Sequence, residues 1–360
     1  MEQFYSQKLC DSVGKAQIVS SFSQTIMNKV AAYARLLRLP GLGGLAIPPV
    51  IAALTVGVYD FYNLSILFFI GAFAAIYGFV LNDYADVEID KLVKELHEKP
   101  LVSGAVSKKN AIAISVFLIL LTFLLISILW YGETLDNYKF MAMLCIVLAG
   151  ILGSFYNLYG KKIVGSDLLV AISVAFVFLF GAITFGEPTI FTWIVFLLTF
   201  NNLMHMNAVE GGIKDADHDY MMGVKNIALG SGVKVDGNNI FIPIHFKVFG
   251  MGIRLFSAFL LFIPFIFYDY DYHMWQIVIL AIAILGVMYF SIKLLSITKF
   301  DRNVIRKYIG IQSFLRYSLV PIMLISTIGL IYSVILIVFP IMWYIIFAPL
   351  IGEKLFRPRM

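Results

Sequence analysis

Residues 64–90 read LSILFFIGAFAAIYGFVLNDYADVEID, so an apolar run of nearly membrane-spanning length leads directly into a cluster of acidic residues. Residues three and four positions apart share one face of a helix. This spacing allows four side chains to point into one cavity, namely those of Asn82, Asp83, Asp86 and Asp90. Glu88 lies off that face, and we expect it to be solvated.

A second acidic cluster, Lys214-Asp215-Ala216-Asp217-His218-Asp219, stands later in the chain and is followed by Gly223. Asp215 and Asp219 again have helical spacing, whereas Asp217 is two residues from each and is expected to face away. Like charges at close range repel and raise one another's pKa values unless positive charge lies among them. A pair of Mg²⁺ ions is the simplest such charge, because magnesium binds a few carboxylates together with the oxygens of a phosphorylated substrate.

The composition indicates a polytopic membrane protein. Of the 360 residues, 61% are hydrophobic and 14% are charged, and the mean hydropathy is +0.90, which excludes an ordinary soluble domain. The successive apolar segments are 41–59, 64–81, 111–130, 140–155, 167–185, 190–206, 249–267, 274–295, 308–331 and 333–350. Several approach the roughly 20 residues of a spanning helix, so they predict an all-α bundle of up to ten crossings.

Basic residues set the expected orientation. They gather in alternate connections, and the opposite connections carry almost none beyond Lys139, so the positive-inside rule places both acidic clusters and both termini in the cytoplasm. Two of the basic connections, 82–110 and 207–248, are long enough to be functional. Within the second, residues 233–242 form two β-prone runs around an Asp-Gly turn, which predicts a small hairpin over the site.

Residues 1–40 are less apolar and lack a cleavage site, so we expect an interfacial amphipathic segment rather than a signal peptide. The only cysteines are Cys10 and Cys145, expected in the cytoplasm and in the membrane, and they predict neither a disulfide framework nor a zinc site. A polar run ends the sixth apolar segment, where we expect helix capping and bonds between helices. Its members are Asn201, Asn202, His205 and Asn207.

The two acidic clusters resemble the motifs of the UbiA superfamily of intramembrane prenyltransferases, of the 4-hydroxybenzoate polyprenyltransferase and digeranylgeranylglyceryl phosphate synthase type. Asn82 to Asp90 fits the family's NDxxDxxxD motif without a mismatch, and Asp215-x-x-x-Asp219-x-x-x-Gly223-x-Lys225 looks like its second aspartate motif. The stretch Lys99-Pro100-Leu101-Val102-Ser103-Gly104 resembles its Arg-Pro-x-x-Ser-Gly turn, with Lys in place of Arg. The resemblance spans about residues 35–331 and implies nine core helices around a central cavity open to the cytoplasmic side.

The chain also departs from the family pattern. The family's tyrosine and lysine after the fourth helix are matched only approximately, by Tyr156, Tyr159, Lys161 and Lys162. Asn226 stands where the family usually has Thr. The loop 230–247 and the segment after residue 331 look like additions, so the expected organisation is an N-terminal segment 1–40, a prenyltransferase domain 41–331 and an extra C-terminal segment 332–360.

The resemblance implies that an allylic polyprenyl diphosphate enters from the bilayer and that two magnesium ions hold its diphosphate, whose departure leaves an allylic cation for an acceptor. The implied metal ligands are Asn82, Asp83, Asp86, Asp90, Asp215 and Asp219. The implied catalytic residues are Asp86, Asp90, Asp215, Asp219 and Lys161. The residues expected to bind substrate are Asn82, Lys99, Tyr156, Lys162, Lys225, Arg35 and Arg38. Tyr84 and Tyr156 are the aromatic residues best placed to face the cation.

The expected partners are a polyprenyl diphosphate, a lipophilic or aromatic acceptor and membrane lipid, with no nucleic acid. The sequence leaves open whether the acceptor is the aromatic ring of a quinone precursor or the hydroxyl of geranylgeranylglyceryl phosphate. A different class of function is transport of cations or phosphorylated lipids, with the carboxylates as the binding site. The enzyme is favoured because both clusters lie at the ends of apolar segments and lead into long loops on one side.

Overall fold

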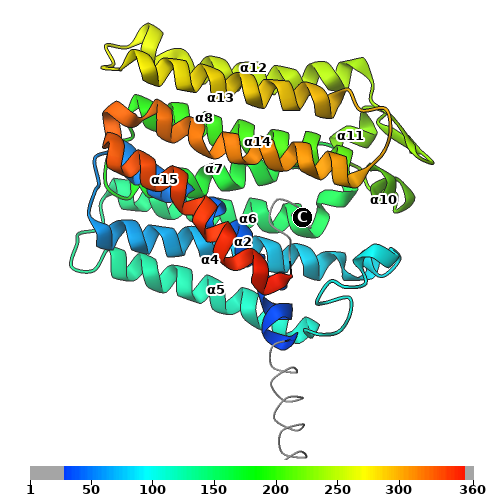
Figure 1. The fold of residues 1–360 in the computed structure, drawn as a ribbon. Helices are drawn as coiled ribbons and strands as arrows, with labels where there is room; N and C mark the ends of the chain where they lie inside the picture. The colour runs from blue at the N-terminus through cyan, green and yellow to red at the C-terminus, as the bar shows by residue number, and fades with distance from the viewer. Residues whose placement is uncertain (1–27, 353–360) are drawn as a thin grey trace, which may run out of the picture.

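The computed structural model describes residues 28–352, which form a bundle of helices with one small hairpin (Figure 1). Cys10, most of the N-terminal segment and the basic residues of the C-terminal tail therefore lie outside the described residues. A helix over residues 28–36 comes first. The α-helices that follow are α2 (Leu39–Leu45), α3 (Pro48–Thr55), α4 (Phe61–Asp90), α5 (Lys108–Leu129), α6 (Asn137–Tyr159), α7 (Asp167–Ile183), α8 (Ile190–Met204), α9 (Gly212–Lys214), α10 (Ala216–Met221), α11 (Ile227–Gly230), α12 (Ile244–Phe267), α13 (Met274–Leu295), α14 (Arg302–Met323) and α15 (Ile325–Phe347).

Short irregular helices join some of these elements. Three are 3₁₀ helices, η1 (Lys94–Leu96), η2 (Gly160–Lys162) and η4 (Ala348–Ile351), and the fourth, η3 (His205–Gly211), is a π-helix. The hairpin pairs β1 (Lys234–Asp236) with β2 (Asn239–Phe241) in antiparallel register. In Figure 1, α12 and α13 lie along one side of the bundle and α5 lies along the opposite side.

Seven helical segments of the described part of the chain are long and apolar enough to cross a membrane. They are Asn28–Thr55, Phe61–Asp90, Lys108–Leu129, Asn137–Lys162, Ile244–Phe267, Met274–Leu295 and Ile325–Ile351, and Asp167–Ile183 is a shorter apolar helix. Large apolar side chains such as Phe117, Leu285 and Ile331 remain exposed on them, as expected for surfaces that face lipid. The all-α membrane class is therefore confirmed, while the number of crossings stays a prediction.

Helix α4 is longer than the apolar run that predicted it. Its N-terminus is capped by Asp60, whose carboxylate accepts the backbone N–H of Asn63 at 2.8 Å. The helix then continues through the whole first acidic cluster and ends at Asp90. Asp83, Asp86 and Asp90 are therefore carried by a regular helix, with the spacing that a shared face requires.

The apolar segment 41–59 does not form one continuous helix, although residues 28–55 together are long and apolar enough to cross a membrane once. The chain breaks there into α2 and α3, because Pro48 and Pro49 lack the backbone N–H groups that a continuous helix would use. The second of these short helices lies very close to α7. A Cβ added at Gly181 would be 2.1 Å from the Pro49 carbonyl oxygen, so only glycine allows this approach.

The predicted boundary between the last two apolar segments is also displaced. Helix α14 ends at Met323 and α15 begins at Ile325, whereas hydropathy placed the break near residue 332. Both segments are apolar there, so hydropathy gives no signal of the boundary. The chain turns at Leu324 and kinks at Gly329, whose φ is 81°. Helix α15 packs against α2 and α14, and the Trp343 indole N–H donates to the Leu39 carbonyl oxygen at 2.8 Å.

The predicted hairpin is confirmed. Val235 pairs with Ile240, and Gly237 supplies the positive φ of 56° that the tight turn requires. Ile240 also donates its backbone N–H to the Thr298 carbonyl oxygen at 2.9 Å, so the hairpin is joined to the segment that precedes α14. Strand β1 contacts α10, and α10, α11 and the end of α4 lie at the same end of the bundle (Figure 1).

Candidate active site

The aspartates of the first cluster share one buried face of α4. Asp83 and Asp86 are each 6% exposed and Asp90 is 2% exposed. Each carboxylate contacts a cation: Asp86 is 2.9 Å from Lys161 Nζ and Asp90 is 2.6 Å from Lys99 Nζ. Buried carboxylates need such partners, because an unpaired charge would carry a large desolvation cost.

The second cluster faces the first. Asp215 is half-buried and lies 3.4 Å from Lys214 Nζ, and Asp219 accepts a hydrogen bond from Asn226 Nδ2 at 2.7 Å. Burial raises the pKa of Asp219 to about 7, and the nearby carboxylates of Asp215 and Asp86 add to the rise. The charge of Asp86 acts on Asp219, and the end of α4 and α10 lie at the same end of the bundle (Figure 1), so both clusters can contribute to one acidic site.

Lysines lie between the two clusters. Lys161 contacts Asp86 and also acts on Asp219, and its carbonyl oxygen accepts the Lys225 backbone N–H at 2.8 Å, which fastens η2 to the loop after α10. Burial alone would lower the pKa of Lys99, but the carboxylates of Asp83 and Asp90 outweigh it and raise that pKa above its ordinary value. Lys99 therefore carries a positive charge throughout the physiological pH range.

Arg38 is held in an unusual conformation. It is the one residue other than glycine within 28–352 that has a positive φ, with φ 47° and ψ 44°. Its guanidinium lies 3.0 Å from Asp83 Oδ1 and 4.7 Å from the ring centroid of Phe79. Left-handed backbone at a non-glycine residue costs free energy and is concentrated at functional sites, which fits a role for Arg38 in this acidic site.

The donor set fits magnesium when a phosphorylated ligand completes the coordination. Within residues 28–352, no three acidic, histidine or cysteine side chains lie close enough together to enclose one metal ion. Mg²⁺ does not require such a cage, because it usually takes one or two carboxylates and completes its shell with water and substrate phosphates. The two groups of carboxylates provide hard oxygen ligands, and the raised pKa of Asp219 shows that its negative charge is unfavourable until a cation stabilises it.

The remaining predicted site residues contact the aspartates less closely than Lys99, Lys161 and Arg38 do. Asn82 and Tyr156 are half-buried, and Tyr156 lies within the electrostatic influence of Asp86 and Asp219. The side chains of Lys162 and Lys225 are exposed. The structure thus brings Lys99, Lys161 and Arg38 to the aspartates and leaves Lys162 and Lys225 at the surface.

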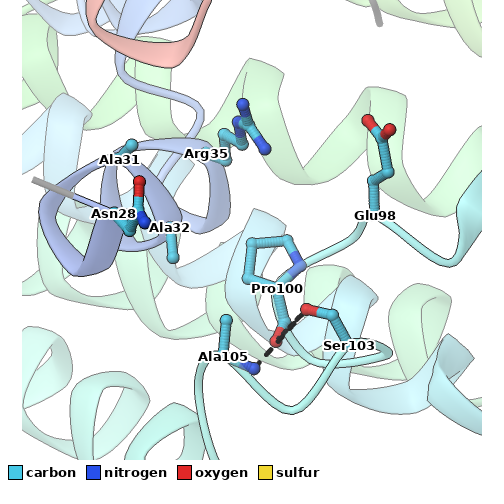
Figure 2. Close-up of a pocket in the computed structure, with 8 residues that line it drawn as sticks. All are labelled: Asn28, Ala31, Ala32, Arg35, Glu98, Pro100, Ser103 and Ala105. Atoms are coloured by element: carbon cyan, nitrogen blue, oxygen red, sulfur yellow. Dashed lines mark hydrogen bonds between the residues drawn. The ribbon is translucent and has the colours of Figure 1, made fainter. Parts of the chain in front are cut away.

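Arg35 lies apart from the carboxylates. It lines a pocket of about 200 Å³ between the helix over residues 28–36 and the loop after α4, shown in Figure 2. Arg35 and Glu98 face this pocket from different segments, and Arg35 Nε donates to the Ile351 carbonyl oxygen at 3.1 Å. The other lining residues are Asn28, Ala31, Ala32, Pro100, Ser103 and Ala105.

The acidic residues expected to face outward do so. Glu88 is exposed and contacts Lys91 at 3.0 Å and Lys108 at 2.6 Å. Asp217 accepts from Arg302 Nη2 at 2.6 Å. Glu88 therefore makes surface contacts, whereas the partly buried Asp217 joins α10 to α14.

Buried polar residues also lie outside the two aspartate motifs. Asp167, at the start of α7, is 5% exposed, and its Oδ2 has no hydrogen-bond partner among the described residues. Glu210 is 1% exposed and lies between two arginines, although the sequence gives it no distinguishing spacing. The polar run before it is only partly as expected: Asn207 Nδ2 donates to the Leu203 carbonyl oxygen of its own helix at 2.8 Å, while Asn201 Nδ2 has no partner in the part of the chain described.

A sequence profile of the UbiA prenyltransferase family matches residues 45–307, so the chain belongs to this family. The chain is 30% identical over 155 residues to the 4-hydroxybenzoate octaprenyltransferase of Vesicomyosocius okutanii, an alignment that covers 42% of this chain and 52% of that one. It is 28% identical to the digeranylgeranylglyceryl phosphate synthase of Sulfurisphaera tokodaii, covering 57% of this chain and 71% of that one. The chain thus spans about half the length of the first of these relatives.

The fold is similar to that of a solved UbiA homolog from Archaeoglobus fulgidus bound to GPP and Mg²⁺. The TM-score is 0.57 at 16% identity, and the alignment covers 85% of this chain and 99% of that one. The predicted family is confirmed, and the helical bundle is the fold of its members. These comparisons offer no support for a transporter.

Proposed function

We propose that this chain is a magnesium-dependent prenyltransferase of the membrane that moves a polyprenyl group from an allylic polyprenyl diphosphate to an acceptor and releases diphosphate. The observation that carries the proposal is the meeting of two aspartate clusters, from α4 and α10, around Lys161. Two facing groups of carboxylates with cations among them suit a ligand that is itself a metal-bound polyanion. The named relatives include prenyltransferases of two kinds.

In this proposal two Mg²⁺ ions bind the oxygen donors of both clusters. The residues that would hold them are Asn82, Asp83, Asp86, Asp90, Asp215 and Asp219. When bound, the metal neutralises the diphosphate and makes it a better leaving group. The UbiA homolog from Archaeoglobus fulgidus, which has a similar fold, is solved with Mg²⁺ bound, and this supports the assignment.

The chain's own cations hold the departing group. Lys161 and Lys99 are fixed by the aspartates, so their charges are in place before the substrate arrives. Fixed positive charge stabilises the negative charge that develops on the diphosphate as the allylic C–O bond breaks, at no cost of reorganisation. Lys162 and Lys225, at the surface, would guide the diphosphate to the site.

The electrons of the broken C–O bond leave with the diphosphate, and a bond then forms between the allylic carbon and the acceptor, which gives up a proton. Tyr84 and Tyr156 lie beside the motif residues, and a ring face there would attract the allylic cation. The acceptor would be the aromatic ring of a quinone precursor or the hydroxyl of geranylgeranylglyceryl phosphate. Arg38 and the pocket that Arg35 lines would bind its anionic group.

We also propose where the protein lies in the cell and which residues form its catalytic unit. The chain would lie in the cell membrane with nine core helices and a tenth C-terminal one, and its basic connections would place the site at the cytoplasmic side. The catalytic unit would be residues 41–331, followed by the added segment 332–360.

An acceptor panel tests the proposal. Purified protein in detergent would receive geranylgeranyl diphosphate and Mg²⁺ with 4-hydroxybenzoate, a naphthoate or geranylgeranylglyceryl phosphate, and products would be identified by mass spectrometry. We expect one acceptor class to give a prenylated product. Diphosphate binding without product from any member of the panel would contradict the proposed reaction with these acceptors. Flux measurements in vesicles would then test whether the protein is a transporter.

A further inference from the structure

A second polar cluster lies in the half of the bundle built from η3, α12, α13 and α14, and its members belong to neither aspartate motif. Its centre is Glu210 in the π-helix η3, which is 1% exposed. Charged groups buried in a membrane bundle are costly and are therefore usually functional. The cluster consists of His205, Glu210, Arg254, Ser291, Gln312 and Arg316.

Two arginines hold the Glu210 carboxylate. Arg254 Nη2, from α12, lies 2.8 Å from Glu210 Oε1, and Arg316 Nη1, from α14, lies 2.8 Å from the same oxygen. Arg254 Nε also donates to Ser291 Oγ at 3.2 Å, and Ser291 Oγ donates to Gln312 Oε1 at 2.6 Å. Three helices thus fix the position of one side chain.

The π-helix that carries Glu210 leads directly into the second aspartate motif. The Asp215 backbone N–H donates to the Gly211 carbonyl oxygen at 3.0 Å, and the Asp219 N–H donates to the Asp215 oxygen at 2.9 Å. Gly212 lies between Gly211 and Asp215 in sequence. It is so close to α11 that a Cβ added to it would be 2.5 Å from Ala228 Cβ. A displacement of Glu210 is therefore passed along a continuous hydrogen-bonded turn to the two aspartates.

The π-helical turn also sets the direction in which the side chains after it point. An α-helix advances about 100° per residue, so a turn that holds one extra residue rotates everything after it by about that angle. If η3 relaxed to an α-helix, Asp215 and Asp219 would turn away from α4, whose Asp86 carboxylate now acts on Asp219. The contacts of Glu210 with Arg254 and Arg316 favour the π-helical register.

We propose that Glu210, clamped by Arg254 and Arg316, is a positioning residue that holds η3 in its π-helical register and so aims Asp215 and Asp219 at the diphosphate site. This inference rests on the proposed function, because it assigns those two aspartates to the metal and diphosphate. With Gln at position 210, two buried guanidinium groups would face each other without a carboxylate between them. Their repulsion would displace the turn.

Three purified variants in detergent test the inference: Glu210→Gln, the double variant Glu210→Gln/Arg316→Gln, which restores the original net charge, and Gln276→Met. The last is a control for lost stability, since buried Gln276 Nε2 donates to the Ile322 carbonyl oxygen at 2.7 Å at the start of α13, outside the cluster. Two readouts are independent of turnover: Mn²⁺ titration followed by electron paramagnetic resonance, and hydrogen–deuterium exchange of residues 211–221.

We expect Glu210→Gln to weaken Mn²⁺ binding about 10- to 100-fold, as the loss of a residue that orients metal ligands does, and to speed exchange in 211–221. The double variant should recover part of both effects. Gln276→Met should lower the melting temperature and leave both readouts unchanged. Wild-type Mn²⁺ affinity and exchange in Glu210→Gln would overturn the inference and leave the cluster a purely structural clamp. A wild-type protein that binds Mn²⁺ but prenylates no acceptor would instead refute the proposed function and leave the positioning role standing.

Discussion

At the scale of single residues, the aspartates of α4 are paired with cations. Asp86 with Lys161 and Asp90 with Lys99 form short contacts in a buried setting, where removing one partner leaves the other charge uncompensated. The pairs therefore keep the positive charges at the acidic site in the absence of ligand. A bound, metal-neutralised diphosphate would share these same cations.

The metal ligands give the first prediction. Asp86→Asn and Asp219→Asn should each lower prenyl transfer by about 100-fold or more, because each removes a negative oxygen from the donor set while it keeps the shape of the side chain. Initial rates at saturating diphosphate substrate measure the effect. Glu88→Gln is the matched control, since Glu88 is exposed and contacts only surface lysines, and its rate should stay within twofold of wild type. Equal losses in Glu88→Gln and Asp86→Asn would contradict the assignment.

The lysines give the second prediction. Lys161→Met should reduce kcat by about 100-fold, because a fixed cation is lost from the place where negative charge develops on the leaving group. Its neighbour Lys162 is exposed, so Lys162→Met should change kcat by less than threefold. Steady-state kinetics of the two variants separate the roles, and the reverse ranking would refute them.

At the scale of helices, close approach between α3 and α7 gives the third prediction. Gly181→Ala should destabilise the protein by about 1–3 kcal/mol, because the new Cβ would overlap the Pro49 carbonyl oxygen. Thermal unfolding in detergent measures the loss. Gly252→Ala in α12 is the control, since nothing lies within 4 Å of its added Cβ, and it should leave the melting temperature unchanged or raise it. Similar losses in both would show that the approach of α3 to α7 does not limit stability.

The helices and the hairpin were largely predictable, and the failures have physical causes. Met274–Leu295 was predicted to the residue, because polar segments flank its apolar run on both sides. The break at Leu324 was missed because apolar residues continue through it, and the division of α2 from α3 was missed because hydropathy does not register the effect of Pro48 and Pro49.

The part of the candidate site that one helix carries was predictable, because residue spacing within a helix determines which side chains share a face. Helical spacing placed Asp83, Asp86 and Asp90 on one face, and the structure agrees. The partners from distant segments were not predictable, because Arg254 and Arg316 reach Glu210 across 44 and 106 residues of sequence. Only the fold brings such charges together, and no local pattern marks them.

At the scale of the whole molecule, Arg302 connects the segment after the first motif with the beginning of the second. From the start of α14 it contacts Glu95 in the loop after α4, and it donates to Asp217 at 2.6 Å and to the Lys214 carbonyl oxygen at 3.4 Å. Arg302 is 207 residues from Glu95 in sequence, so this contact joins α14 to the segment after α4. We expect this contact to hold the two acidic clusters at a fixed separation.

That connection gives the fourth prediction. Arg302→Met should lower kcat/KM by about tenfold, since a loosened second motif misplaces its carboxylates relative to Asp86. The exposed Lys307 lies in the same helix, and Lys307→Met should leave kcat/KM near the wild-type value. Kinetics of both variants at fixed Mg²⁺ provide the comparison, and a wild-type kcat/KM in Arg302→Met would show that the motifs hold their separation without it.

The central claim is that the two aspartate clusters form one magnesium-dependent site for prenyl transfer. It is tested most directly by measuring released diphosphate and prenylated product together in wild-type protein, with Mg²⁺ or with EDTA, and in Asp86→Asn and Asp219→Asn. We expect equal amounts of diphosphate and product with Mg²⁺, neither with EDTA, and about 100-fold less of both in either variant. Product formation in EDTA, or at the wild-type rate in one of the two variants, would contradict it.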